Sequence, residues 1–243
     1  MTARRPFPLI LLPGLDGTAR LFERFLGAAT GALDLRRIPY PADRFLDYPD
    51  LETLVRSRLP RDEPFALLGE SFGGPLALRV AAGRPRGLTA VVLAATFHRK
   101  PANPVIARAA PLGPAFFRLP LPPHVVRLLL AGGDAPRELV EEVREAVRQV
   151  PAGVMAARAK AALAVDASEP LRKCPVPLLF LGGKRDRLLR TTLPGEIRAL
   201  QPRAEVRLLD TPHLVLQRRP EEAMRIVEEF VLRHAGGARP EAA

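Results

Sequence analysis

Three residue types that cooperate in nucleophilic catalysis occur here in settings suited to that chemistry, and the first is Ser71. It is the central residue of GESFG at 69–73, where an apolar run gives way to a helical pattern. A GxSxG sequence at a strand-to-helix junction is typical of a strained turn that exposes a serine hydroxyl above a sheet. Ser57 and Ser168 lack this setting, so Ser71 is the predicted nucleophile. The alternative is a glycine-rich turn with a serine helix cap.

A serine hydroxyl needs a base to take its proton and an acid to orient that base. Asp186 follows the apolar run 178–181, and His213 follows the apolar run 206–209. We predict that His213 is the base and Asp186 the orienting acid. The alternatives are a structural histidine and a carboxylate that caps its own loop.

The rival candidates have weaker settings. Asp210 lies three residues before His213, where we expect it to stabilise the loop through an Asx-type hydrogen bond. The other histidines lie in different settings: His98 precedes the expected cap, His124 follows two prolines within it, and His234 ends the last expected helix.

The order serine, aspartate, histidine, with each residue after an apolar run, resembles the α/β-hydrolase family over residues 8–234. The resemblance implies an oxyanion hole formed by two backbone N–H groups, those of Phe72 and Leu15. Leu15 lies in LLPGLDGT at 11–18, where Pro13-Gly14 stands in place of the His-Gly of many members. Ser71 at the elbow disfavours the dehalogenases and epoxide hydrolases of this fold, which use aspartate. The segments PGLDGT and GESFGG also resemble the hydrolase-like segment of phytyl ester synthase acyltransferases.

The elements that must position these residues alternate along the chain. Helical patterns separate short apolar runs, which favours an α/β fold with a mostly parallel sheet of about six strands and helices on both faces. The family's leading antiparallel hairpin is missing from this pattern. The expected strands are 8–12, 35–38, 65–68, 90–94, 178–181 and 206–209, and the expected helices are 19–29, 51–59, 71–82, 193–200 and 221–234.

Residues 98–170 interrupt this alternation. They contain no strand candidate but hold apolar helical pieces and an amphipathic stretch at 136–150, so we expect a helical cap over the site. The predicted core is then 1–97 with 171–235, and 236–243 is a predicted disordered tail. The alternative for the apolar cap residues is that they only pack the cap onto the core. Those expected to contact substrate are Phe116, Phe117 and Leu121.

Composition narrows the function classes. The formal net charge is +11, but the basic residues form no run of five and no nucleic-acid-binding motif appears, so we expect no nucleic-acid partner. The sequence contains no stretch of 18 apolar residues, so we expect no transmembrane helix. The single cysteine, Cys174, favours a reducing compartment, so we expect a cytoplasmic location.

These inferences predict a cofactor-free and metal-free serine hydrolase that acts on a small-molecule ester with an apolar acyl or alcohol portion. A thioesterase or an acyltransferase would use the same three residues. A non-catalytic ligand-binding protein on the same scaffold is the alternative from another class, since a fold does not by itself establish chemistry.

Overall fold

The computed structural model describes residues 5–100 and 121–236, and their strands form one sheet. All neighbouring strands are parallel, in the order β2-β1-β3-β4-β5-β6. The predicted sheet of about six strands is confirmed, and it is entirely parallel. The strands are β1 (Phe7–Leu12), β2 (Leu33–Arg37), β3 (Phe65–Glu70), β4 (Leu88–Ala94), β5 (Leu178–Gly183) and β6 (Glu205–Leu209).

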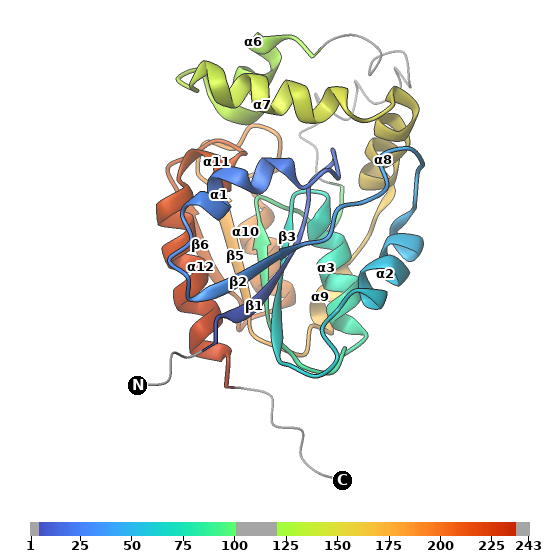
Figure 1. Cartoon of the computed structure of the whole chain (residues 1–243), viewed down its shortest axis with the longest axis vertical. Coiled ribbons are helices and arrows are strands. Elements are labelled where there is room, and N and C mark those ends of the chain that lie inside the picture. The colour runs from blue at the N-terminus through green and yellow to red at the C-terminus, as the bar shows by residue number, and fades with distance from the viewer. Residues whose placement is uncertain (1–4, 101–120, 237–243) are drawn as a thin grey trace.

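The central strands are largely apolar because both faces of the sheet are covered, and Glu70 at the end of β3 is an exception. Successive residues of β1 point to opposite faces, so that Ile10 and Leu12 join one core cluster while Leu9 and Leu11 join the other. Helices α2 (Tyr48–Ser57), α3 (Gly73–Ala82), α9 (Ser168–Arg172) and α10 (Leu193–Leu200) supply the first cluster. The short helix α1 (Glu23–Gly27), the 3₁₀ turn η1 (Arg20–Phe22), α11 (Val215–Arg218) and α12 (Pro220–His234) supply the second (Figure 1).

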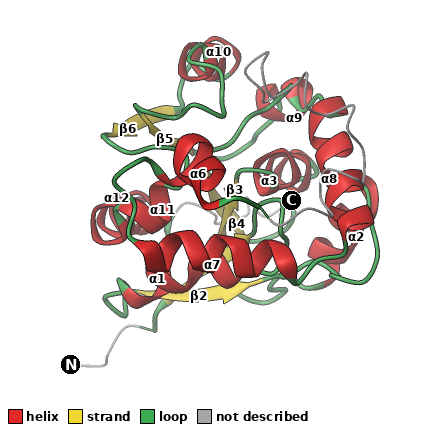
Figure 2. Cartoon of the chain, turned by 90° about the horizontal axis from the view of Figure 1, so that it is seen from above, coloured by secondary structure: helices red, strands yellow, loops and turns green. Residues whose placement is uncertain are grey.

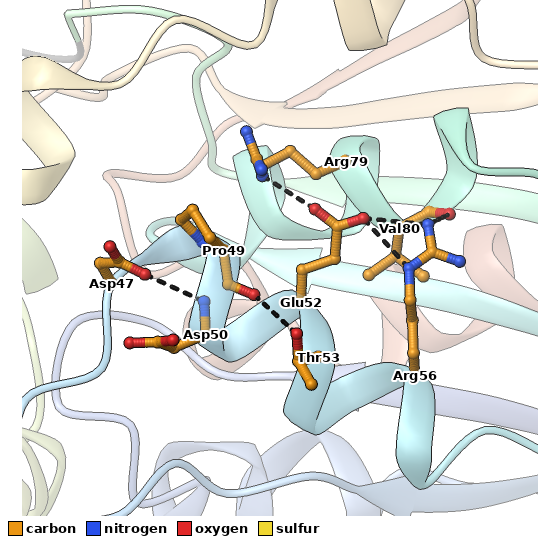
Figure 3. A network of polar contacts seen from close by, with 8 residues as sticks. All are labelled: Asp47, Pro49, Asp50, Glu52, Thr53, Arg56, Arg79 and Val80. Carbon is orange, nitrogen blue, oxygen red and sulfur yellow. Dashed lines mark hydrogen bonds and ion pairs between the residues drawn. The ribbon is translucent and has the colours of Figure 1, made fainter.

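Helix α2 begins three residues earlier than its apolar pattern predicts, because Asp47 caps it. The Asp47 carboxylate accepts a hydrogen bond from the Asp50 N–H at 2.9 Å. Further along, Glu52 accepts hydrogen bonds from Arg56 and from Arg79 of α3, and Arg56 also donates to the Val80 carbonyl (Figure 3). This network fastens α2 to the helix that follows Ser71.

The described helices between β4 and α9 lie over one end of the sheet, the end to which the carboxyl termini of the strands point (Figures 1 and 2). We call these helices the cap. They are α6 (Pro123–Val126), the π-helical turn η3 (Arg127–Ala131), α7 (Arg137–Arg148) and α8 (Ala152–Ala164). The proposed limits of core and cap stay a prediction.

An isolated antiparallel bridge joins Arg99 to Asp166, where the sequence predicts no strand. In the same place the Ala167 N–H donates to the His98 carbonyl at 2.7 Å, so the segments entering and leaving the cap lie side by side. Among residues 5–100 and 121–236, no helix is both long and apolar enough to cross a bilayer.

Candidate active site

Ser71 occupies the turn between β3 and α3 in a left-handed conformation, with φ at 48°. Such a backbone is uncommon for a residue other than glycine and marks stored strain. The two glycines of GESFG make the turn possible. A Cβ on Gly69 would lie 2.4 Å from the Gly73 carbonyl oxygen, and a Cβ on Gly73 would lie 2.4 Å from that of Leu12. The Ser71 N–H donates to the Ala94 carbonyl at 3.0 Å, which holds the turn against β4.

The structure brings His213 and Asp186 into line with this serine. The Nε2 atom of His213 lies 3.2 Å from Ser71 Oγ, and its Nδ1 atom lies 2.8 Å from Asp186 Oδ2. Asp186 follows β5 and His213 follows β6, so neighbouring parallel strands deliver both side chains to the same edge of the sheet. With the Nδ1 proton donated to the carboxylate, Nε2 is the acceptor for the Ser71 hydroxyl.

Asp186 is held in place by its second carboxylate oxygen. Its Oδ1 accepts hydrogen bonds from the Leu188 and Leu189 N–H groups at 2.8 and 3.0 Å. Burial alone would favour the neutral carboxyl, but the charge and hydrogen bond of His213 and these two amides outweigh it, so the pKa of Asp186 lies below its ordinary value.

His213 is buried, and burial opposes its protonation. The charge and hydrogen bond of Asp186, with a smaller contribution from Glu70, outweigh that effect, so the pKa of His213 lies above its ordinary value. A protonated imidazole at position 213 is therefore stabilised by its surroundings.

The rival residues lie elsewhere. Asp210 is exposed and forms an ion pair with Arg185 at 2.8 Å, so the predicted Asx-type hydrogen bond is wrong. The Asp210 side chain is exposed beside the Arg185 guanidinium, which accounts for this ion pair. His98 is buried 3.4 Å from Glu196, His124 lies in α6 of the cap, and His234 packs against Phe230 in α12.

Two segments that carry backbone amides lie next to Ser71. Phe72 directly precedes α3, and the loop after β1 approaches so closely that a Cβ on Gly14 would lie 3.7 Å from the Ser71 Cβ. Within the part of the chain that the structure describes, neither the Phe72 N–H nor the Leu15 N–H has a hydrogen-bond acceptor. The N-terminus of α3 adds a favourable field for negative charge at this point.

A family model described as "Alpha/beta hydrolase family" matches residues 9–225. The chain belongs to the alpha/beta hydrolase family. Among curated proteins no match is found.

Several solved structures share the fold of this chain. An enol-lactonase from Burkholderia xenovorans is 16% identical, with a TM-score of 0.78, 96% of this chain covered and 94% of that one. A lipase-esterase related protein from Clostridium acetobutylicum is 14% identical, with a TM-score of 0.77, 93% of this chain covered and 95% of that one. The esterase EaEST from Exiguobacterium antarcticum is 14% identical, with a TM-score of 0.75, 95% of this chain covered and 93% of that one.

The cap of this alpha/beta hydrolase contacts both sides of the site. Leu15 packs against a cluster formed by Val150, Val154 and Met155. Leu214, next to His213, packs into a second cluster with residues of η3 and α7, and its N–H donates to the Leu130 carbonyl at 3.1 Å. Leu121 packs against this second cluster, whereas Phe116 and Phe117 lie outside the described residues.

A carboxyl group that the sequence analysis does not single out lies next to Ser71 in the chain. Glu70 is buried at the end of β3, and its Oε1 accepts a hydrogen bond from Gln217 Nε2 at 2.7 Å. Burial raises the pKa of Glu70 to about 7. The sequence feature that could have indicated Glu70 is a carboxyl group at the end of an otherwise apolar strand. Among the described residues, no group of three or more His, Cys, Asp and Glu could hold a metal ion.

Proposed function

We propose that this protein is a serine hydrolase that cleaves carboxylic esters through an acyl-enzyme, with Ser71 as nucleophile, His213 as base and Asp186 as orienting acid. The observation that carries the proposal is the continuous hydrogen-bonded line from Ser71 Oγ through the His213 ring to Asp186, with distances of 3.2 and 2.8 Å. Family membership and structural neighbours described as an esterase and an enol-lactonase support an ester-type substrate.

In the proposed mechanism, His213 takes the hydroxyl proton as Ser71 attacks the ester carbonyl. The negative charge on the carbonyl oxygen is stabilised by the N–H groups of Phe72 and Leu15, which have no other acceptor among the described residues. The imidazolium then donates its proton to the leaving alcohol, and the acyl-enzyme remains. Water activated by the same histidine releases the acid and restores the serine.

We propose that the acyl or alcohol portion is apolar. The side chains that flank the site are those of the two apolar clusters, one around Leu15 and the other around Leu214. Each methylene group of a substrate that such surfaces remove from water contributes about 0.8 kcal/mol at most. The predicted contacts of Phe116, Phe117 and Leu121 with substrate stay part of this proposal, as does the cytoplasmic location.

A panel of p-nitrophenyl esters with straight acyl chains from two to eight carbons tests the proposal. We expect kcat/KM to rise from acetyl to a medium chain and a succinyl ester to be poor. A parallel series of acyl thioesters, with and without an alcohol acceptor, distinguishes ester hydrolysis from the thioesterase and acyltransferase alternatives. Hydrolysis of no ester would contradict the proposed reaction, and a flat or falling profile would contradict the apolar pocket.

A further inference from the structure

Arg158 extends from cap helix α8 into the loop after β1, and only 1% of its surface is exposed. Its Nη1 donates to the carbonyl oxygens of Leu15 and Asp16 at 3.1 and 2.6 Å, and its Nη2 donates to that of Pro41 at 2.8 Å. The guanidinium also lies over the Tyr40 ring, 5.8 Å from its centroid. A residue of the cap thus reaches the segment that carries a proposed oxyanion donor, 143 positions away in the sequence.

Every carbonyl from position 13 to position 16 has a donor. The Tyr40 hydroxyl donates to the Pro13 carbonyl at 3.1 Å, the Gly17 N–H donates to the Gly14 carbonyl at 3.0 Å, and Arg158 holds the next two. Since each peptide group is planar, fixing a carbonyl also fixes the direction of the N–H in the same group. The Leu15 N–H shares its peptide group with the Gly14 carbonyl, which the Gly17 N–H holds, and the Gly17 N–H shares its group with the Asp16 carbonyl, which Arg158 holds. Arg158 therefore acts on the Leu15 N–H through Gly17. The loop is therefore held while its Leu15 N–H stays without an acceptor among the described residues.

Gly17 provides an independent sign that the loop is built around this guanidinium. Its φ is +68°, and a Cβ there would lie 2.6 Å from Arg158 Nη1 and 2.9 Å from the Tyr40 ring. A side chain at position 17 would displace the cation from the loop. The second glycine of PGLDGT thus has a role beyond that of an ordinary turn.

The partners of the Arg158 guanidinium are unusual for a residue that only attaches the cap to the core. No carboxylate of the described residues forms an ion pair with Arg158, and its Nε has no hydrogen-bond partner there. Burial lowers the pKa of the guanidinium, partly offset by the charge of Asp16. A buried cation is costly without partners that use its charge, and here those partners are three backbone carbonyls.

We propose that Arg158 is a positioning residue that holds the loop at 13–17 so that the Leu15 N–H is directed at the oxyanion formed on attack by Ser71. The inference rests on the proposed function and goes beyond it, because it makes the oxyanion hole depend on how the cap is seated. The transition state, rather than ground-state binding, is then the species that Arg158 stabilises.

The test compares Arg158→Gln with Lys160→Gln, which removes the same charge from an exposed position of the same helix. For p-nitrophenyl butyrate we expect Arg158→Gln to lower kcat by about 10- to 100-fold with KM changed less than about threefold, because losing an oxyanion donor outright costs about 10²- to 10³-fold. Arg158→Lys should restore part of the loss, since an ammonium group can still donate to these carbonyls. Lys160→Gln should leave both constants unchanged.

Amide hydrogen exchange of the peptide covering residues 9–22 provides a readout that needs no substrate. We expect faster exchange in Arg158→Gln than in Lys160→Gln. Tyr40→Phe, which removes only the hydroxyl bonded to the Pro13 carbonyl, should show the same fall in kcat to a lesser degree and keeps the test available if Arg158→Gln does not fold.

Unchanged kcat and unchanged exchange in Arg158→Gln would overturn the inference, as would a rise in KM alone, which would make Arg158 a substrate-binding residue. If the wild-type protein hydrolyses no ester, the proposed function fails by itself. In that case the exchange experiment still decides whether Arg158 positions the loop.

Discussion

Replacing Asp186 by asparagine should exchange the hydrogen-bond donor and acceptor between residue 186 and His213 while leaving the positions of the side chains unchanged. The amide oxygen can still accept from Leu188 and Leu189, as Oδ1 does now at 2.8 and 3.0 Å. That arrangement turns the NH₂ group toward His213 Nδ1, which must then accept a hydrogen bond. The ring proton moves to Nε2, so the nitrogen that faces Ser71 Oγ at 3.2 Å can no longer take its proton.

We expect Asp186→Asn to lower kcat by about 10⁴-fold, the cost of the wrong tautomer in a serine relay, which corresponds to about 5 kcal/mol in the activation barrier. Steady-state hydrolysis of p-nitrophenyl butyrate at constant pH measures this loss. Asp210→Asn is the matched control, because Asp210 is 69% exposed and, among the residues that the structure describes, pairs only with Arg185. Its kcat should change less than about threefold, as for a surface ion pair. If the two variants ranked in the opposite order, the acid would be assigned wrongly.

Two further predictions concern protonation. The kcat/KM should rise with pH as His213 loses its proton, and the midpoint of this rise should lie above 6.5, the ordinary pKa of histidine. Glu70→Gln should lower the midpoint, because the charge of Glu70 stabilises the protonated ring. An unchanged midpoint would contradict this coupling. Glu70 favours its neutral form in the folded protein, with a pKa of about 7 against 4.5 when unperturbed, so its contribution to stability is present below pH 4.5 and is lost as pH rises through 7. Urea unfolding at pH 5 and pH 8 measures this loss. The free energy of unfolding of Glu70→Gln minus that of wild type should be larger at pH 8 than at pH 5, by about 3 kcal/mol at most. The same difference at both pH values would show that the pKa of this carboxyl is not perturbed.

The sequence was most informative where a local pattern determines the local structure. The four central strands could be predicted from apolar runs, because a strand buried on both faces must be apolar along its length. The edge strands β2 and β6 have weaker patterns, because they are only partly buried and carry charged residues. The positions of Ser71, Asp186 and His213 after three of these strands could be predicted for the same reason, since parallel strands end at one edge. Only their roles remain proposals.

Contacts between distant segments have no such local signal. The approach of Arg158 to the Leu15 carbonyl depends on how the cap is seated, which no apolar periodicity encodes. Helix limits also differed from the pattern where capping decides them, as at Asp47, and the helix predicted from Ser71 begins at Gly73 because the strained turn occupies the first two positions. Asp210 paired with Arg185 because both side chains are exposed on adjacent loops.

The central claim is that Ser71 is the nucleophile, and labelling with a fluorophosphonate probe tests it most directly. Its hydroxyl is the one aligned with His213 Nε2, so intact-mass analysis of wild-type protein should show a single adduct that peptide mapping places on Ser71. Ser71→Ala should give no adduct at the same probe concentration and time, and its kcat should fall by about 10⁶-fold. Labelling of Ser71→Ala at the wild-type rate would contradict the claim.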